Sequence, residues 1–129
     1  MSAVPRNAPL RLLIVDDSNI MRRRIERCQN IPQLEVVGSA SNGLDALELF
    51  CKTDPDVVTM DITMPHMDGI ECVERIVAIK PNILILVISA LADKATAVEA
   101  MEKGANGFLN KPFSDRQLNE ALEELLGNA

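Results

Sequence analysis

The pattern that most constrains this chain is an alternation, repeated five times, between short apolar runs and longer amphipathic stretches. Each apolar run has the length of a strand, and each amphipathic stretch repeats its apolar residues at helical spacing. Such alternation predicts right-handed crossovers and one parallel sheet that is covered by helices on both faces. The predicted strands are Arg11–Val15, Leu34–Ala40, Asp56–Met60, Ile83–Ile88 and Gly107–Leu109.

Capping and helix-breaking residues agree with this alternation. The hydroxyls of Ser18 and Ser114 can accept hydrogen bonds from the free backbone N–H groups at a helix start. Gly104 lies where the end of a helix favours a residue in the left-handed conformation. Pro55 and Pro81 precede predicted strands, where a helix must already have ended. The apolar stripes of the five expected helices are Met21, Ile25 and Cys28; Gly43, Ala46, Leu47 and Phe50; Ile70, Val73, Ile76 and Val77; Ala97, Val98 and Met101; and Leu118, Ala121, Leu122 and Leu125.

The second predicted strand is the most polar, so we expect it at an edge of the sheet. The strand order 2-1-3-4-5 follows, with the first and third strands adjacent. We therefore predict a doubly wound, five-stranded, flavodoxin-like α/β sandwich of three layers. Residues 1–9 are expected to form a flexible tail and residues 10–127 a single domain.

Composition narrows the class of protein. The chain has 129 residues, with three Phe and neither Trp nor Tyr, so aliphatic side chains must supply most of the core. The net charge of −6 argues against direct nucleic-acid binding. Three widely separated cysteines indicate reduced thiols, and no signal peptide or bilayer-spanning run is visible. We expect a cytoplasmic domain with no membrane insertion.

Polar residues follow four of the predicted strands. Asp16 and Asp17 follow the first, Asp61 the third, Ser89 the fourth and Lys111 the fifth. Because parallel strands place their carboxyl ends along one edge of a sheet, these five side chains should meet in one crevice.

Three neighbouring carboxylates repel one another, and a divalent cation removes that repulsion. Mg²⁺ prefers hard oxygen ligands, usually one or two carboxylates together with phosphate oxygens and water. We expect Asp17 and Asp61 as direct ligands and Asp16 as a ligand through water. Lys111 would contact a phosphate oxygen, and Ser89 would supply a hydroxyl donor.

Ser89 has no histidine partner in sequence, since the sole histidine, His66, lies in a different loop. A carboxylate can itself be the nucleophile and form an aspartyl phosphate. Asp61 is assigned as the acceptor because it is the lone acid at the central strand end. The simpler interpretation treats the three acids as helix caps, Ser89 as a strand-end hydroxyl and Lys111 as a surface lysine.

Four segments of the chain, in the correct order, resemble the response-regulator receiver family of two-component signalling, and in particular its single-domain chemotaxis-type members. The segments span the whole chain apart from the tail, and together they are far more specific than any one of them. They are Val15–Ser18, Met60–Gly69, Ser89-Ala90 and Gly104–Phe113.

The resemblance implies that Asp61 takes a phosphoryl group from a phosphohistidine on a sensor histidine kinase or histidine phosphotransfer protein. It implies Mg²⁺ bound by Asp17, Asp61 and the backbone carbonyl of Thr63. It also implies a cis peptide bond at Lys111-Pro112. The chain would catalyse only its own phosphorylation and dephosphorylation, and it would not be an enzyme in the usual sense.

The resemblance further implies a switch made of Ser89 and Phe108, whose ring turns inward when the hydroxyl moves to the phosphate. Many relatives carry Tyr or His at that position, whereas this chain has Phe108. A phenol hydroxyl therefore cannot report the switch here. The responsive surface would comprise the fourth helix, fifth strand and fifth helix (Leu91–Glu102, Phe108 and Ser114–Leu118). It would bind a downstream target protein, with the chain monomeric or dimerising on phosphorylation.

Two alternatives remain. A haloacid-dehalogenase-like phosphatase also uses an Asp nucleophile, but it needs a second acid two residues later, where this chain has Thr63. The chain can also be a receiver cut from a DNA-binding regulator. Its ending, Leu125–Ala129, shows no linker and mildly favours a complete protein.

Overall fold

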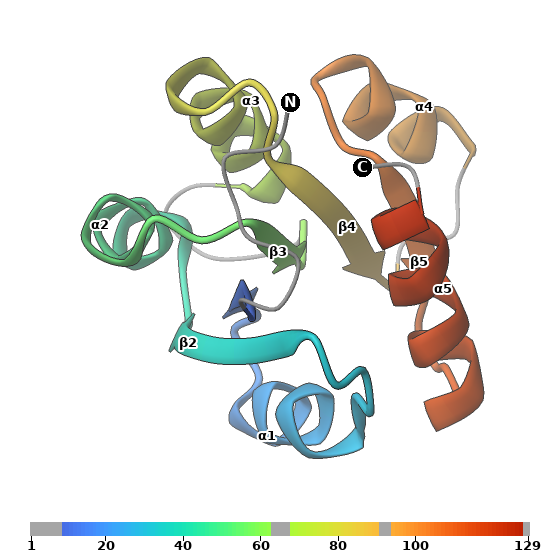
Figure 1. Cartoon of the computed structure of the whole chain (residues 1–129). Helices are drawn as coiled ribbons and strands as arrows, with labels where there is room; N and C mark the ends of the chain where they lie inside the picture. The colour runs from blue at the N-terminus through green and yellow to red at the C-terminus, as the bar shows by residue number, and fades with distance from the viewer. Residues whose placement is uncertain (1–8, 63–67, 91–93, 128–129) are drawn as a thin grey trace.

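The structure is a computed structural model of the chain, and it describes residues 9–62, 68–90 and 94–127. Strands and helices alternate throughout these residues, as the sequence predicts (Figure 1). They are β1 (Leu10–Val15), α1 (Asn19–Cys28), β2 (Leu34–Ala40), α2 (Gly43–Thr53), β3 (Val57–Met60), α3 (Gly69–Ile79), β4 (Leu84–Ser89), α4 (Lys94–Glu102), β5 (Gly107–Asn110) and α5 (Asp115–Gly127).

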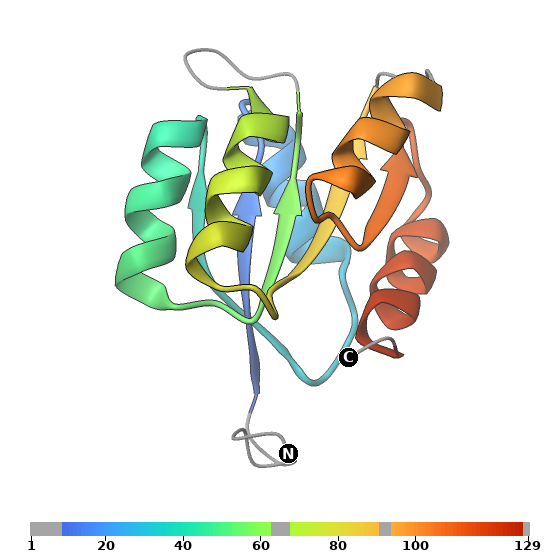
Figure 2. The same ribbon diagram turned by 90° about the horizontal axis from the view of Figure 1, so that it is seen from above.

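All five strands form one parallel sheet in the order β2-β1-β3-β4-β5, which confirms the predicted topology. The polar strand β2 lies at an edge. Central strands β1 and β3 end side by side, with Val15 paired to Met60. Figure 2 shows the strand arrows pointing the same way, so the residues after them share one edge of the sheet.

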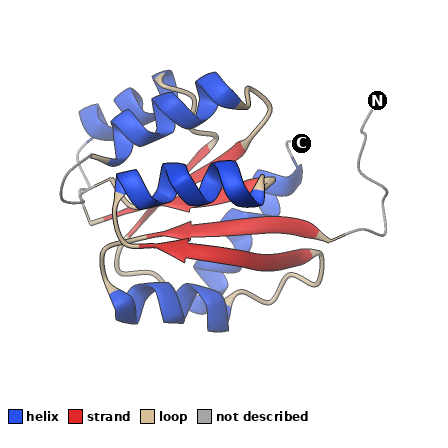
Figure 3. Cartoon of the chain, turned by 90° about the vertical axis from the view of Figure 1, so that its left-hand side faces the viewer, coloured by secondary structure: helices blue, strands red, loops and turns tan. Residues whose placement is uncertain are grey.

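Helices cover both faces of the sheet (Figures 1 and 3). On one face α2, α3 and α4 pack over alternate strand residues such as Val15, Met60 and Val87. On the other face α1 and α5 pack over the intervening residues, including Ile14 and Ile88. Period-two alternation of strand side chains therefore builds two separate, mostly aliphatic cores.

The predicted caps are confirmed. The Ser18 hydroxyl accepts a hydrogen bond from the Met21 N–H at the start of α1, and the Ser114 hydroxyl accepts one from the Gln117 N–H near the start of α5. Gly104, after α4, has a φ of 120°, which lies in the left-handed region that favours glycine.

Two details differ from the sequence predictions. Five strand limits, in four of the five strands, shift by one residue; Ser89, for example, belongs to β4 instead of following it. The expected apolar stripe of α4 is wrong: Val98 and Met101 are exposed, and Ala100 is the buried residue. Ala100 lies against the core with no exposed surface, and its small side chain produces little of the periodic signal that a large apolar residue gives.

The three cysteines are free thiols, and Cys72 is buried in the core. None of the helices among the described residues is both long enough and apolar enough to cross a bilayer.

Candidate functional site

Three carboxylates meet at the carboxyl end of the two central strands. One oxygen from each of Asp16, Asp17 and Asp61 lies within 4.8 Å of the other two. Asp16 and Asp61 are almost completely buried, with 1% and 2% of their surface exposed, whereas Asp17 is exposed. The β1–β3 pairing brings together acids that are 45 positions apart in the sequence, because Asp16 follows Val15 and Asp61 follows its partner Met60.

Lys111 lies against this cluster. Its Nζ is 2.7 Å from Asp16 Oδ2 and 3.8 Å from Asp61 Oδ2, and 17% of its side-chain surface is exposed. The other Asp16 oxygen, Oδ1, accepts a hydrogen bond of 2.8 Å from the Ser18 N–H. Asp16 is therefore held on both oxygens, by the start of α1 on one side and by Lys111 on the other.

The capping interpretation of the acids does not describe this geometry. Ser18 caps α1, and Asp68 caps α3 by accepting from the Glu71 N–H. Asp17 and Asp61 occupy neither cap position, and Lys111 is an ion-paired residue at the cluster. Helix capping therefore does not explain why Asp17 and Asp61 lie in this cluster.

Lys111 is the first residue of the loop after β5. Its backbone N–H donates to the Ser89 carbonyl at 2.9 Å, which ties it to the end of β4. The Lys111-Pro112 peptide bond is cis, as the resemblance implied.

Ser89 and Phe108 lie on the α4 side of the sheet. Ser89 is completely buried at the end of β4, two residues after Val87, so both side chains point to the same face. Phe108 pairs with Val87 across the β4–β5 ladder and packs, half-buried, against the same core.

Gly69, the first residue of α3, fits closely against the Asp61 backbone. A Cβ at this position would lie 2.3 Å from the Asp61 carbonyl oxygen and 2.4 Å from Ile62 Cα. The Gly69 N–H donates to the Ile62 carbonyl at 3.2 Å. The absence of a side chain here lets α3 begin directly behind the buried acid.

Two arginines of α1 contact the site loops, and neither was among the residues expected to build the site. Arg22 donates to the Asp16 carbonyl at 2.7 Å, and Arg24 donates to the Phe113 carbonyl. No local motif marks such contacts, because they depend on which loops the fold places beside the helix. Thr63, His66 and Leu91 lie outside the described residues.

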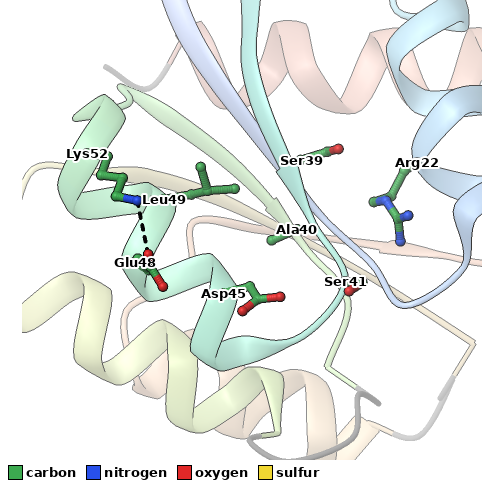
Figure 4. A pocket seen from close by; sticks show the side chains of 8 residues that line it. All are labelled: Arg22, Ser39, Ala40, Ser41, Asp45, Glu48, Leu49 and Lys52. Atoms are coloured by element: carbon green, nitrogen blue, oxygen red, sulfur yellow. Dashed lines mark hydrogen bonds and ion pairs between the residues drawn. The ribbon is translucent and has the colours of Figure 1, made fainter.

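A shallow pocket of about 300 Å³ lies beside the site, between Arg22, the end of β2 and α2 (Figure 4). Its charged lining consists of two bases, Arg22 and Lys52, and two acids, Asp45 and Glu48. Lys52 is paired with Glu48 at 3.0 Å. The formal charges of these four residues cancel, whereas the acidic cluster carries an excess of negative charge.

Comparison with known proteins identifies the class. Residues 12–123 match the response regulator receiver domain. The chain is 43% identical over 115 residues to chemotaxis protein CheY of Listeria monocytogenes, covering 89% of this chain and 97% of that one. This chain therefore belongs to the response-regulator receiver family and is CheY-like.

Similar solved structures support this family membership. The response regulator domain of Thermotoga maritima CheB is 35% identical, with a TM-score of 0.80 over 92% of this chain and 95% of that one. CheY in a CheX–CheY–BeF₃–Mg²⁺ complex from Borrelia burgdorferi is 29% identical, with a TM-score of 0.87 over 92% of this chain and 90% of that one.

Proposed function

We propose that this receiver domain is a phosphorylation-operated switch in which Asp61 accepts a phosphoryl group from a phosphohistidine. The observation that carries the proposal is the cluster of Asp16, Asp17 and Asp61 within 4.8 Å, with Lys111 in contact at one side. This site resembles the arrangement that phosphoryl transfer needs, in which positioned charges stabilise the transferring group.

The donor set fits Mg²⁺. Three carboxylates and one ammonium leave a net charge of −2 among these four groups, and every available ligand atom is a hard oxygen. We assign Asp17 and Asp61 as direct ligands, with the Thr63 carbonyl, and Asp16 through water. When bound, the cation would neutralise charge that develops on the transferring phosphoryl oxygens. The Borrelia burgdorferi relative was solved as a complex that contains BeF₃ and Mg²⁺, which supports a Mg²⁺ site in this chain.

In the transfer step, an Asp61 carboxylate oxygen attacks phosphorus while the phosphorus–nitrogen bond of the donor breaks. The electron pair of that bond stays with the imidazole nitrogen, and Asp61 becomes an aspartyl phosphate. Lys111 would exchange its contact with Asp16 for one with a phosphoryl oxygen, since its Nζ already lies 3.8 Å from Asp61 Oδ2. The donor is a sensor histidine kinase or a histidine phosphotransfer protein.

Ser89 and Phe108 would carry the signal away from the site. The buried Ser89 hydroxyl is proposed to bond the new phosphate, and the Phe108 ring to turn further inward on the same side of the sheet. The surface that changes is the face of α4, β5 and α5, where the exposed Val98 and Met101 offer apolar contact to a target protein. The phosphate shifts this equilibrium only by its different affinity for the two states.

The test is labelling by acetyl phosphate in the presence of Mg²⁺. Asp61→Asn should abolish the label, whereas Asp54→Asn should retain it, because Asp54 is an exposed acid just before β3, at the opposite end of that strand. An acid-stable label in Asp61→Asn would assign the acceptor role to Ser89 instead. Sustained, Mg²⁺-dependent turnover of p-nitrophenyl phosphate would favour the phosphatase.

A further inference from the structure

We propose that Arg24 of α1 is a positioning residue that holds the Lys111 loop in place beside Asp16. The inference rests on the proposed function, since it concerns how the phosphoryl-contacting lysine is held. Arg24 itself would not touch the phosphoryl group.

Among the described residues, the Arg24 side chain has one ring contact, one hydrogen bond and one ion pair, and each is with the segment that follows Lys111. Its guanidinium carbon lies 4.4 Å from the centre of the Phe113 ring, within the range of a cation–π interaction. Its Nη2 donates to the Phe113 carbonyl and lies 3.5 Å from Asp115 Oδ1. One side chain of α1 thus fixes positions two and four residues beyond Lys111.

The other end of this loop has its own attachment. The Lys111 N–H bonds the Ser89 carbonyl, so β4 fixes the start of the loop. Phe113 is 4% exposed and packs in the core beneath α1 and α5. Between these anchors the Lys111 side chain has to reach Asp16. Arg24 adds polar contacts between the far anchor and α1 to the apolar packing of Phe113.

The same helix also holds the other member of the ion pair. Ser18, the cap of α1, donates its N–H to Asp16 Oδ1, while Lys111 contacts Asp16 Oδ2. α1 therefore supports Asp16 at its first turn and the Lys111 loop at its second. A shift of the loop relative to α1 would change the 2.7 Å contact directly.

A guanidinium suits this role better than other cations. Its planar fork can stack on a ring while donating to a carbonyl and a carboxylate at its edge. Only 29% of the Arg24 side chain is exposed, so these contacts are partly shielded from water. Arg23, its neighbour, is exposed, and its side chain has no hydrogen bond or ion pair among the described residues.

The matched pair of variants is Arg24→Met and Arg23→Met. Methionine keeps an apolar contact with the Phe113 ring but removes the charge and the donors. Arg24→Met should slow labelling by acetyl phosphate, at saturating Mg²⁺, on the order of tenfold, because a small misplacement of a charge-stabilising group is costly. Arg23→Met should change the rate by less than about twofold, as expected of a surface substitution.

A second experiment measures the chemical reactivity of the Lys111 amine and needs neither metal nor phosphate. Reductive methylation, read by mass spectrometry, should modify Lys111 faster in Arg24→Met than in the wild type. Lys80 is the internal control, since it is 21% exposed and ion-paired to Asp54 and Asp56, far along the chain from α1. Its reactivity should stay unchanged. Arg24→Lys, which keeps the charge but lacks the fork, should fall between wild type and Arg24→Met in both measurements.

Unchanged Lys111 reactivity in Arg24→Met would overturn the inference, as would an equal rise at Lys80, which would indicate general loosening. Equal labelling rates in Arg24→Met and Arg23→Met would also overturn it. If the wild type takes no label at Asp61, the proposed function fails, and the methylation result still decides whether Arg24 positions Lys111.

Discussion

At the scale of single residues, Gly69 shows how closely the start of α3 approaches the backbone of Asp61, the proposed acceptor. The space where a side chain would begin is already occupied by the Asp61 carbonyl and Ile62 Cα. Both are backbone atoms, so a larger residue cannot be accommodated by a rotamer change. The strand end that carries Asp61 and the start of α3 would have to move apart.

Gly69→Ala should therefore destabilise the protein by about 1–3 kcal/mol, the usual cost of overpacking. Urea unfolding measures this change. Gly127→Ala is the control: nothing lies within 4 Å of a Cβ at that position, so its unfolding midpoint should not fall. A Gly69→Ala variant as stable as the wild type would show that α3 does not press on Asp61.

At the scale of elements, α2 and α3 meet around a buried thiol. Cys72, on α3, is fully buried, and its Sγ lies 3.7 Å from the Gly43 carbonyl at the start of α2. Burial raises the pKa of the Cys72 thiol from 9.0 to about 12, because a thiolate would lose its hydration there. The contact between these two helices thus favours the neutral thiol.

The consequence is a loss of stability in alkali. Above pH 9 the unfolded chain releases the Cys72 proton while the folded chain keeps it, up to about pH 12. The contribution of the neutral thiol to the free energy of unfolding is fully present below pH 9 and declines as the pH rises through this window. Urea midpoints at pH 8, 9 and 10 should fall more steeply for the wild type than for Cys72→Ala.

Cys51 provides the comparison, because its side chain is exposed on α2. Cys51→Ala should follow the wild-type pH dependence. If the urea midpoints of the wild type and Cys72→Ala fall equally with pH, the buried thiol ionises as readily in the folded as in the unfolded protein.

At the scale of the whole molecule, repulsion within the acidic cluster lowers the stability that the packed cores provide. Two mostly aliphatic cores hold the sheet between its helices, while three carboxylates converge at one edge of the sheet. Lys111 compensates only part of that charge. Removing one carboxylate without changing its shape should relieve repulsion in the metal-free protein.

Asp17→Asn should raise the stability of the metal-free protein by about 1 kcal/mol, the interaction of two charges near 4 Å in a watery environment. Mg²⁺ should stabilise the wild type, by about 2.7 kcal/mol at 100 times its dissociation constant. Thermal unfolding with and without millimolar Mg²⁺ tests both statements, and Asp17→Asn should respond weakly to the metal. A wild type unaffected by Mg²⁺ would remove the basis for a metal site.

Much of this molecule could be predicted from the chain alone. Alternating strand and helix periods identified all ten elements, the polarity of β2 identified the edge strand, and the polar residues after the strands identified Asp16, Asp17, Asp61 and Lys111 as neighbours. These features depend on patterns within a few residues, or on the rule that parallel strands end together.

What the chain alone could not determine depends on contacts between distant residues. In α4, Ala100 is buried against the core while Val98 and Met101 are exposed, an orientation that the apolar periodicity of the helix does not predict. The same limit applies to Gly69 behind Asp61 and to Arg24 over Phe113, which is 89 positions away. Periodicity reports the environment of a residue along its own element, whereas these contacts exist only after the elements have packed in three dimensions.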